Sequence, residues 1–484
     1  MDPVEFRQLG HALIDWIADY REHIDALPVM SRVQPGAIAA MLPGAPPQKA
    51  EGLADVIADL ERIVLPGITH WNHPGWFAYF PSNTDLSSVL ADLVTAGLGA
   101  QGMSWQTSPA ATEVEDVVME WLRQMLGLSD AFTGVIHDSA STATLCALLC
   151  ARERTTAYSQ NLRGLQGEDA PLVVYASDQA HSSVPKAALL AGFGAEHLRL
   201  IETDAAHALR MDLLEAAVAE DIAEGRRPCA LVATVGTTAT TAIDPVRAMA
   251  AVAGRHGLWL HVDAAMVGSA MICEEYRWAW AGVEQADSLV LNPHKWLGAG
   301  FDLSAYFVRD PEHLVRVMST DPSYLRTAQD GRVRNLRDWG IPLGRRFRAL
   351  KLWFLIRQHG VEGLQDRIRR DIANADWLRR QIDTAPEWER LAPAPFQTLC
   401  VRHVPPGLAG DEQALRTHNL ALVDRVNRGG RCYLTPAVLK GTQIVRISIG
   451  AQATEREHVA GLWQELSEAS QSGPRKPARR VLRL

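Results

Sequence analysis

The sequence predicts an α/β protein built on a mostly parallel central sheet, with helices on both faces of the sheet. Short apolar runs rich in β-formers alternate with helical runs over about residues 86–345, and this order is typical of that architecture. Two strand-like runs also lead to opposite charges: Asp263 ends one, and Lys295 follows the turn after another. Because the carboxyl ends of parallel strands meet at one edge of a sheet, we expect a shared crevice there.

Length and composition narrow the possible functions. A chain of 484 residues is too long for a single core, so we expect two or three domains. The 47% hydrophobic and 21% charged residues and the net charge of -8 fit a cytosolic enzyme and argue against nucleic-acid binding. Neither a signal peptide nor an apolar run long enough to cross a bilayer is evident, which predicts a cytoplasmic protein without membrane contact. Six cysteines without a C-x-x-C pair indicate neither a disulfide framework nor a zinc site.

Residues 1–85 are predicted to form an N-terminal helical arm followed by an aromatic loop. Apolar residues recur at helical spacing from Pro3 to about Leu27, and such a helix needs a surface to lie on, either its own domain or a partner subunit. Residues 69–82 are rich in aromatic side chains and contain prolines that exclude a long helix, so they form either a core plug or a pocket wall. His70 and His73 lie in this loop without a third ligand at useful spacing, so no metal site is predicted.

The large α/β domain is predicted over residues 86–345. A helix is expected near residues 110–128, with further helices near 213–223 and 246–256. The strands of the sheet are expected near residues 173–177, 198–201, 230–235, 258–262 and 288–291. Residues 97–102 match the letters of a dinucleotide fingerprint, but they follow a helical run rather than a strand, so we interpret the match as accidental.

Polar residues stand at one helix start and after two strands of this domain. Residues 138–142, Asp-Ser-Ala-Ser-Thr, precede a helical run near 143–152 and can act as N-caps or as an anion site, since free N–H groups point outward there. His181 follows one strand and Thr238 follows another. A lone histidine is usually structural or solvated, but its position at a strand end favours the crevice.

The chain after the sheet holds a long loop and a second domain. Residues 318–338 have neither helical nor strand periodicity and carry Tyr324; a loop this long is commonly functional or disordered. Residues 346–472 begin with two helices and continue with β-rich runs and further helices, which predicts a small C-terminal α+β domain. Residues 473–484 are basic and expected to be disordered, with polyanion binding as the alternative.

Asp263 and Lys295 together suit one cofactor chemistry. A lysine can hold a cofactor aldehyde covalently, and a carboxylate can keep a pyridine nitrogen protonated so that the ring acts as an electron sink. The stretches His261-Val-Asp-Ala-Ala and Asn292-Pro-His-Lys-Trp resemble those of the pyridoxal 5'-phosphate (PLP) group II decarboxylases, most closely the aromatic-L-amino-acid (DOPA/tryptophan) decarboxylases. The resemblance covers about residues 1–472. It implies the PLP-dependent transferase fold (aspartate-aminotransferase-like, fold type I) and a homodimer with shared active sites.

The resemblance also implies roles for cofactor-binding residues. It assigns the phosphate to Ser139, Ala140 and Ser141, with Asn292 assisting. It places His181 on the pyridine face opposite Ala265, and it places Thr238 and His294 near the cofactor. Many relatives carry glycine where this chain has Asp138, and a carboxylate pointing inward there would repel phosphate.

Catalytic and substrate-binding residues are implied in the same way. The implied catalytic residues are Lys295, Asp263, His181 and Tyr324, with Tyr324 as the catalytic acid of a mobile lid over residues 318–338. The lid is expected to reach the other subunit's active site. The implied substrate-binding residues are Trp71, Tyr79, Phe80, Pro81, Ser82, Gln101, Met103 and Gly344.

The predicted reaction is decarboxylation of an aromatic L-amino acid to its arylalkylamine and CO2. L-DOPA, tryptophan, 5-hydroxytryptophan, tyrosine and phenylalanine are the candidate substrates. An aminotransferase would typically hold the substrate carboxylate with an arginine, and no arginine is singled out for that role. An aromatic aldehyde synthase of this fold is expected to replace Tyr324 by phenylalanine or His181 by asparagine, whereas this chain keeps both. A non-catalytic PLP-binding regulator would leave Lys295, the serine-rich helix start and the lid unexplained as a set.

Overall fold

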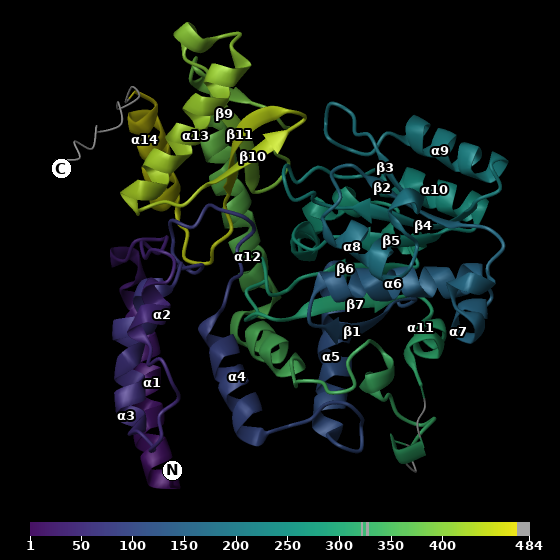
Figure 1. Cartoon of the computed structure of the whole chain (residues 1–484), viewed down its shortest axis with the longest axis horizontal. Coiled ribbons are helices and arrows are strands. Elements are labelled where there is room, and N and C mark those ends of the chain that lie inside the picture. Colours follow the sequence, from purple (N-terminus) through teal and green to yellow (C-terminus); the bar gives the residue numbers. More distant parts are fainter. Residues whose placement is uncertain (321–322, 326–328, 472–484) are drawn as a thin grey trace. The chain divides into compact units, whose positions relative to one another are not determined.

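The computed structural model describes residues 1–320, 323–325 and 329–471, which fall into two compact units (Figure 1). The first unit comprises Met1–Pro81, Trp377–Glu389 and Val401–Leu484. The second and larger unit comprises Ser82–Asp376 and Arg390–Cys400. All the strands predicted for the large α/β domain lie in this second unit.

A seven-stranded sheet forms the centre of the larger unit, with the order β1-β7-β6-β5-β4-β2-β3. Its strands are β1 (Thr133–His137), β2 (Leu172–Ser177), β3 (Leu198–Ile201), β4 (Arg227–Thr234), β5 (Trp259–Asp263), β6 (Ser288–Leu291) and β7 (Ser304–Val308). Strands β2 to β6 pair in parallel, while β7 runs antiparallel to both β6 and β1. The prediction of a mostly parallel sheet is therefore confirmed, and β1 and β7 are strands that the sequence patterns did not reveal.

Helices cover both faces of this sheet. Every residue of β2, β5, β6 and β7 is buried, as expected for strands that have no solvent-facing side. On one face, α6 (Ala140–Thr155) contacts β4 to β7 and lies beside α8 (Ser183–Leu190) and α11 (Pro311–Met318). On the other, α9 (Met211–Ala223) and α10 (Val246–His256) contact β4. The helix predicted near residues 110–128 is α5 (Pro109–Leu126), which contacts β1.

The register of the sheet determines where its polar ends meet. Asp263, the last residue of β5, lies opposite Thr234 of β4 and Val290 of β6. The three strands thus end at the same edge, so the turns that follow them lie next to each other. This is the edge at which the sequence placed the crevice.

The first unit contains the N-terminal arm and most of a four-stranded sheet, of which residues 390 and 398–400 belong to the second unit. Asp2 is the N-cap of helix α1 (Pro3–Glu22), and its carboxylate accepts from Val4 N at 2.8 Å and Glu5 N at 2.9 Å. None of the residues of α1 is buried. The sheet has the order β10-β11-β9-β8, made of β8 (Trp388–Arg390), β9 (Thr398–His403), β10 (Thr435–Leu439) and β11 (Thr442–Ser448). The unit also contains the helices α2 (Ala37–Met41), α3 (Leu53–Asp59), α13 (Glu412–Gly429) and α14 (Arg456–Gln471). None of the helices within the described ranges could cross a membrane by length and apolarity.

Two predicted segments can be compared with the observed chain. The two helices expected after Arg345 are present within α12 (Ala349–Thr384), on either side of Gly360, where φ is +64° and the backbone is not helical. Of the predicted lid, short helical turns are described at Ser323–Leu325 and Leu336–Asp338. Residues 321–322 and 326–328, the Tyr324 side chain and the basic tail from residue 472 onward lie outside the described part of the chain.

Candidate active site

Asp263 is a buried carboxylate at the end of β5. The residue is only 3% exposed, and its Oδ1 accepts a hydrogen bond from Ala265 N at 3.1 Å. A buried carboxylate is costly unless hydrogen-bond donors or a cation face it. The position therefore suits a ligand that presents a protonated nitrogen.

The turn after β6 brings Lys295 to the same edge. Asn292 N donates to Ala265 O at 3.0 Å, which ties this turn to the one after Asp263, and Lys295 N donates to Asn292 O at 2.9 Å. The fully buried Asn83 adds a third link, because its Nδ2 donates to Lys295 O at 2.9 Å. Asn83 was not predicted from the sequence. It lies 212 residues from Lys295 in the chain, and only its position next to Ser82 indicated a link to the site.

His181, after β2, lies within electrostatic range of both groups. Desolvation by burial lowers the pKa of His181; the charge of Asp263 opposes this shift and that of Lys295 adds to it. Its Nδ1 accepts from Ser183 N at 3.1 Å and is 2.8 Å from Ser183 Oγ. Ser183, the first residue of α8, therefore fixes the orientation of the His181 ring. Lys295, Asp263 and His181, which the sequence placed in one crevice, lie together at this edge of the sheet.

The start of α6 is arranged as an anion site. Ser139 is the N-cap, and its Oγ accepts from Thr142 N at 3.2 Å. The first-turn N–H groups of Ala140 and Ser141 have no acceptor one turn earlier in the helix, and the helix dipole adds positive potential there. Asp138 Oδ1 accepts from Ser139 Oγ at 3.4 Å, so this carboxylate stands at the same helix start.

The remaining cofactor candidates surround the strand ends. Thr238 is exposed in the turn after β4, and Ala265 is half-buried just beyond Asp263. Asn292 Oδ1 accepts from Ser304 Oγ at 2.7 Å. His294 is 4% exposed, its Nδ1 accepts from Leu303 N at 3.0 Å, and desolvation lowers its pKa to about 4. His294 is thus a neutral, fixed ring that supports the lysine turn.

Three of the substrate candidates lie together in the larger unit. Gln101 Oε1 accepts from Arg345 N at 2.7 Å, and Arg337 N donates to Met103 O at 2.8 Å. A Cβ atom added at Gly344 would lie 3.2 Å from Gln101 Nε2. A side chain at position 344 would therefore crowd the Gln101 side chain, so the size of the residue at 344 affects the position of Gln101.

The aromatic loop belongs to the first unit up to Pro81, and Ser82 begins the second. Trp71 stacks on Trp76 with ring centroids 4.2 Å apart and on Tyr79 at 5.8 Å. Burial and a hydrogen bond with Tyr79 raise the pKa of Tyr433 to about 12. Pro81 is buried, while Trp71 and Tyr79 remain 38% and 49% exposed. The loop therefore presents aromatic faces rather than serving only as a core plug.

Arg446, on β11, fixes the shape of this loop. Its guanidinium donates to the carbonyl of Tyr79 and lies 4.6 Å from the centroid of the Phe80 ring. Tyr79 has φ +47°, a left-handed conformation that a non-glycine residue adopts only when its surroundings hold it. His70 and His73 also support the loop: His70 Nδ1 is 2.8 Å from Tyr20 OH, and His73 Nδ1 accepts from Gly75 N at 2.8 Å. No sequence pattern indicated a role for Trp76, Tyr433 or Arg446.

Residues 35–402 match the pyridoxal-dependent decarboxylase conserved domain, which is more than half of the chain. The chain belongs to the pyridoxal-dependent decarboxylase family. The family resemblance stated from the two strand-end stretches is thereby confirmed, as is the fold. A PLP-dependent carboxy-lyase uses pyridoxal 5'-phosphate, so PLP is the cofactor of this enzyme.

Individual relatives of this decarboxylase are similar over nearly their full length. Phenylacetaldehyde synthase from Arabidopsis thaliana is 41% identical, with 97% of this chain and 96% of that protein covered. Tryptophan decarboxylase 2 from Oryza sativa subsp. japonica is 39% identical, with 97% and 95% covered. A crystal structure of Oryza sativa TDC with PLP and tryptamine has a TM-score of 0.93 at 35% identity, covering 97% of this chain and 98% of that one.

The donor set of the decarboxylase fits PLP. Lys295 would hold the aldehyde carbon, Asp263 would face the pyridine nitrogen, and the start of α6 would bind the phosphate. When bound, PLP supplies an electron sink for negative charge at the substrate Cα. The buried Asp263 would keep that sink protonated, because a carboxylate beside a nitrogen base raises its pKa.

Proposed function

We propose that this enzyme removes the carboxylate of an aromatic L-amino acid as CO2 and releases the arylalkylamine. The observation that carries the proposal is the convergence of Lys295, Asp263 and His181 at one edge of the sheet. The names of the relatives support an aromatic substrate, since they include tryptophan and tyrosine decarboxylases. The stacked aromatic loop supports the same substrate class.

In the proposed reaction, residues of this chain place the carboxylate and deliver the proton. His181 is assigned to the substrate carboxylate, and desolvation lowers the pKa of its ring. Loss of CO2 leaves negative charge on the substrate Cα, which a positioned acid must protonate. Tyr324 is assigned as that acid, on a lid whose closure excludes water.

Aldehyde formation is the second candidate activity, because a relative at 41% identity is named phenylacetaldehyde synthase. An aldehyde synthase of this fold is expected to lack either the lid tyrosine or the stacking histidine. This chain has Tyr324 and His181. We therefore favour the amine as the product.

A substrate panel tests the proposed function. We expect kcat/KM for tryptophan, 5-hydroxytryptophan, L-DOPA, tyrosine or phenylalanine to exceed that for glutamate and histidine by roughly 10²-fold or more, since an aromatic wall leaves a polar side chain unpaired. CO2, amine, aldehyde and peroxide should be quantified in each reaction. A preference for glutamate or histidine would contradict the aromatic pocket, and aldehyde with peroxide as the main products would favour the second candidate.

We also propose that the enzyme is a homodimer with shared active sites. Helix α4 (Leu86–Leu98) of the larger unit exposes a row of large apolar side chains at Leu86, Leu90, Leu93, Val94 and Leu98. Helix α1 of the first unit has no buried residue and exposes Val4 and Phe6. Apolar rows of this kind favour a second copy of the chain as their cover.

Complementation tests the shared site. A Lys295→Ala chain mixed with a Tyr324→Phe chain should regain decarboxylation at about half of the wild-type rate per mixed dimer, because one of its two sites has both residues intact. Mixed dimers are isolated with two different affinity tags before the assay. Isolated mixed dimers that remain as inactive as either parent would exclude a lid that acts across subunits.

A further inference from the structure

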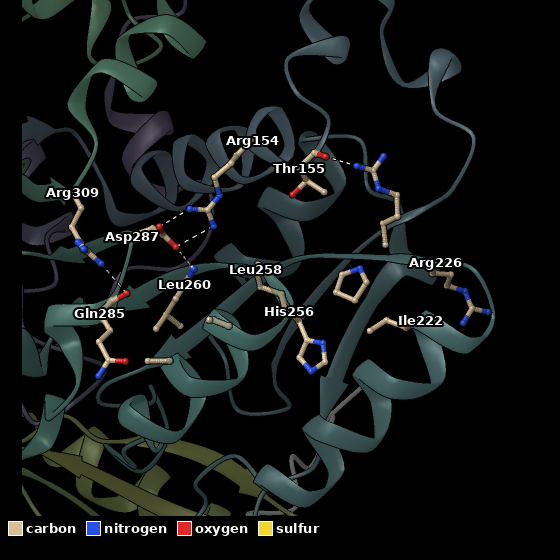
Figure 2. A pocket seen from close by; sticks show the side chains of 16 residues that line it. Arg154, Thr155, Ile222, Arg226, His256, Leu258, Leu260, Gln285, Asp287 and Arg309 are labelled. Atoms are coloured by element: carbon tan, nitrogen blue, oxygen red, sulfur yellow. Dashed lines mark hydrogen bonds and ion pairs between the residues drawn. The ribbon is translucent and has the colours of Figure 1, made fainter.

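A cavity lies at the edge of the larger unit's sheet opposite to the active site. It has a volume of about 920 Å³ and opens where β4 and β5 begin (Figure 2). Leu258, just before β5, and Leu260 of β5 form an apolar floor together with Ala250 and Ala253 of α10. The volume is within the range of small-molecule sites.

The rim of this cavity is basic. Arg154, Arg226, Arg227 and Arg309 line it, with Asp287 as the single acidic residue among the lining side chains. Arg154 is directed at Asp287 at 2.6 Å (Figure 2). Arg226 pairs with Asp221 at 2.8 Å, and Arg227 pairs with Glu168 at 3.1 Å. Three of the four arginines thus have an acidic partner in the protein.

Arg309 differs from the other three. Its Nη1 donates to Gln285 O at 3.4 Å, and across the described ranges of the chain no carboxylate forms an ion pair with it. A guanidinium carries five N–H donors, so most of those of Arg309 are available to a ligand. Arg154 also keeps donors to spare, because its bonds to Asp287 use one N–H from each of two nitrogens.

Interactions with the carbonyl ends of helices account for only some of the four arginines at the rim. The carbonyl ends of α6 and α10 lie near the rim, and Arg227 donates to the carbonyl of Thr155 at the end of α6. Arg309 follows β7, and its bond to Gln285 O lies at the C-terminal end of the short 3-10 helix Val283–Gln285. Among the described residues this bond uses one of its five N–H donors, which leaves the others for a ligand.

We propose that this cavity binds a small organic polyanion with a flat apolar part, of the nucleoside phosphate class. The phosphates contact Arg309 and Arg154, and the ring lies on the apolar floor formed by β5 and α10. The site is separate from the PLP site, because the extended chain from Leu258 of the floor to Asp263 at the end of β5 spans roughly 17 Å at about 3.3 Å per residue.

The test is calorimetric titration of the full-length, PLP-loaded enzyme with ADP at fixed ionic strength and without divalent cations. With PLP bound, the phosphate position at α6 is filled. We expect one saturable ADP site per chain, weaker binding of pyrophosphate and no binding of adenosine. Arg309→Gln should weaken ADP binding about tenfold or more, through the loss of charge-assisted hydrogen bonds.

Arg255→Gln is the matched control. Arg255 is exposed on α10 but pairs with Glu215 at 2.6 Å outside the cavity lining, so the variant loses the same charge without touching the rim. It should change ADP affinity less than about twofold. Three results would overturn the proposal: no saturable ADP binding, equal weakening by both variants, or adenosine binding as tightly as ADP.

Discussion

Replacing Lys295 with alanine is expected to abolish amine formation and covalent retention of PLP. The turn after β6, linked to Ala265 and Asn83, presents this amine at the edge where Asp263 ends β5. Lys295 is the residue that would hold PLP covalently, so its loss should lower the rate by at least the roughly 10²–10⁴-fold typical of one catalytic group. The measurements are the rate of amine release and, for the wild type, the position of the label after borohydride reduction.

Two other lysines serve as controls for this result. Lys186 is exposed on α8, so Lys186→Ala should keep both activity and the label. Lys351 is buried, but its Nζ donates to Gly300 O at 2.8 Å and Asp302 O at 3.1 Å, so its amine is already engaged. A label on Lys351, or wild-type rates in the Lys295→Ala enzyme, would refute the assignment.

Tyr324→Phe is expected to change the product rather than only the rate. Without the phenolic donor, amine formation should fall roughly 10²–10⁴-fold, the range for one general acid. The negative charge at Cα then persists long enough to react with O2, and hydrolysis yields the aldehyde, ammonia and hydrogen peroxide. The assay compares amine, aldehyde and peroxide yields and follows oxygen consumption.

The control for this variant is Tyr276→Phe. The Tyr276 ring lies in the larger unit, with its centroid 6.0 Å from that of the Phe396 ring. Tyr276 is not a candidate site residue, so removing its hydroxyl should leave the product unchanged. If the Tyr324→Phe enzyme still makes the amine at the wild-type rate, another group donates the proton.

The helices and strands with a clear apolar pattern in their own residues could be predicted from the sequence. Apolar runs with helical or strand character located β2 to β6, α9 and α10 to within a few residues. Strands β1 and β7 were not found. Pairing of β7 with both β1 and β6 depends on residues far apart in the chain, and neither short run stands out by itself.

The residues of the candidate site could likewise be predicted only where a local pattern marks them. Asp263, Lys295 and His181 could be predicted because each ends or follows a recognisable strand, and strand ends in a parallel sheet converge. Asn83 could not, because nothing in its own neighbourhood indicates a bond to a carbonyl 212 residues away. Arg446 was missed for the same reason: its contact with Tyr79 spans 367 residues.

That span has a consequence for how the enzyme is made. Phe77 N donates to Tyr433 O and Ser448 N donates to Phe77 O, so the aromatic loop is anchored by segments near the other end of the chain. At about 5–20 residues per second, a ribosome needs roughly 20–70 s to translate the 367 residues between Tyr79 and Arg446. For that time the nascent loop carries its tryptophans without these partners. A nascent chain halted before β11 should therefore be cut by protease within the loop, whereas the completed chain should resist.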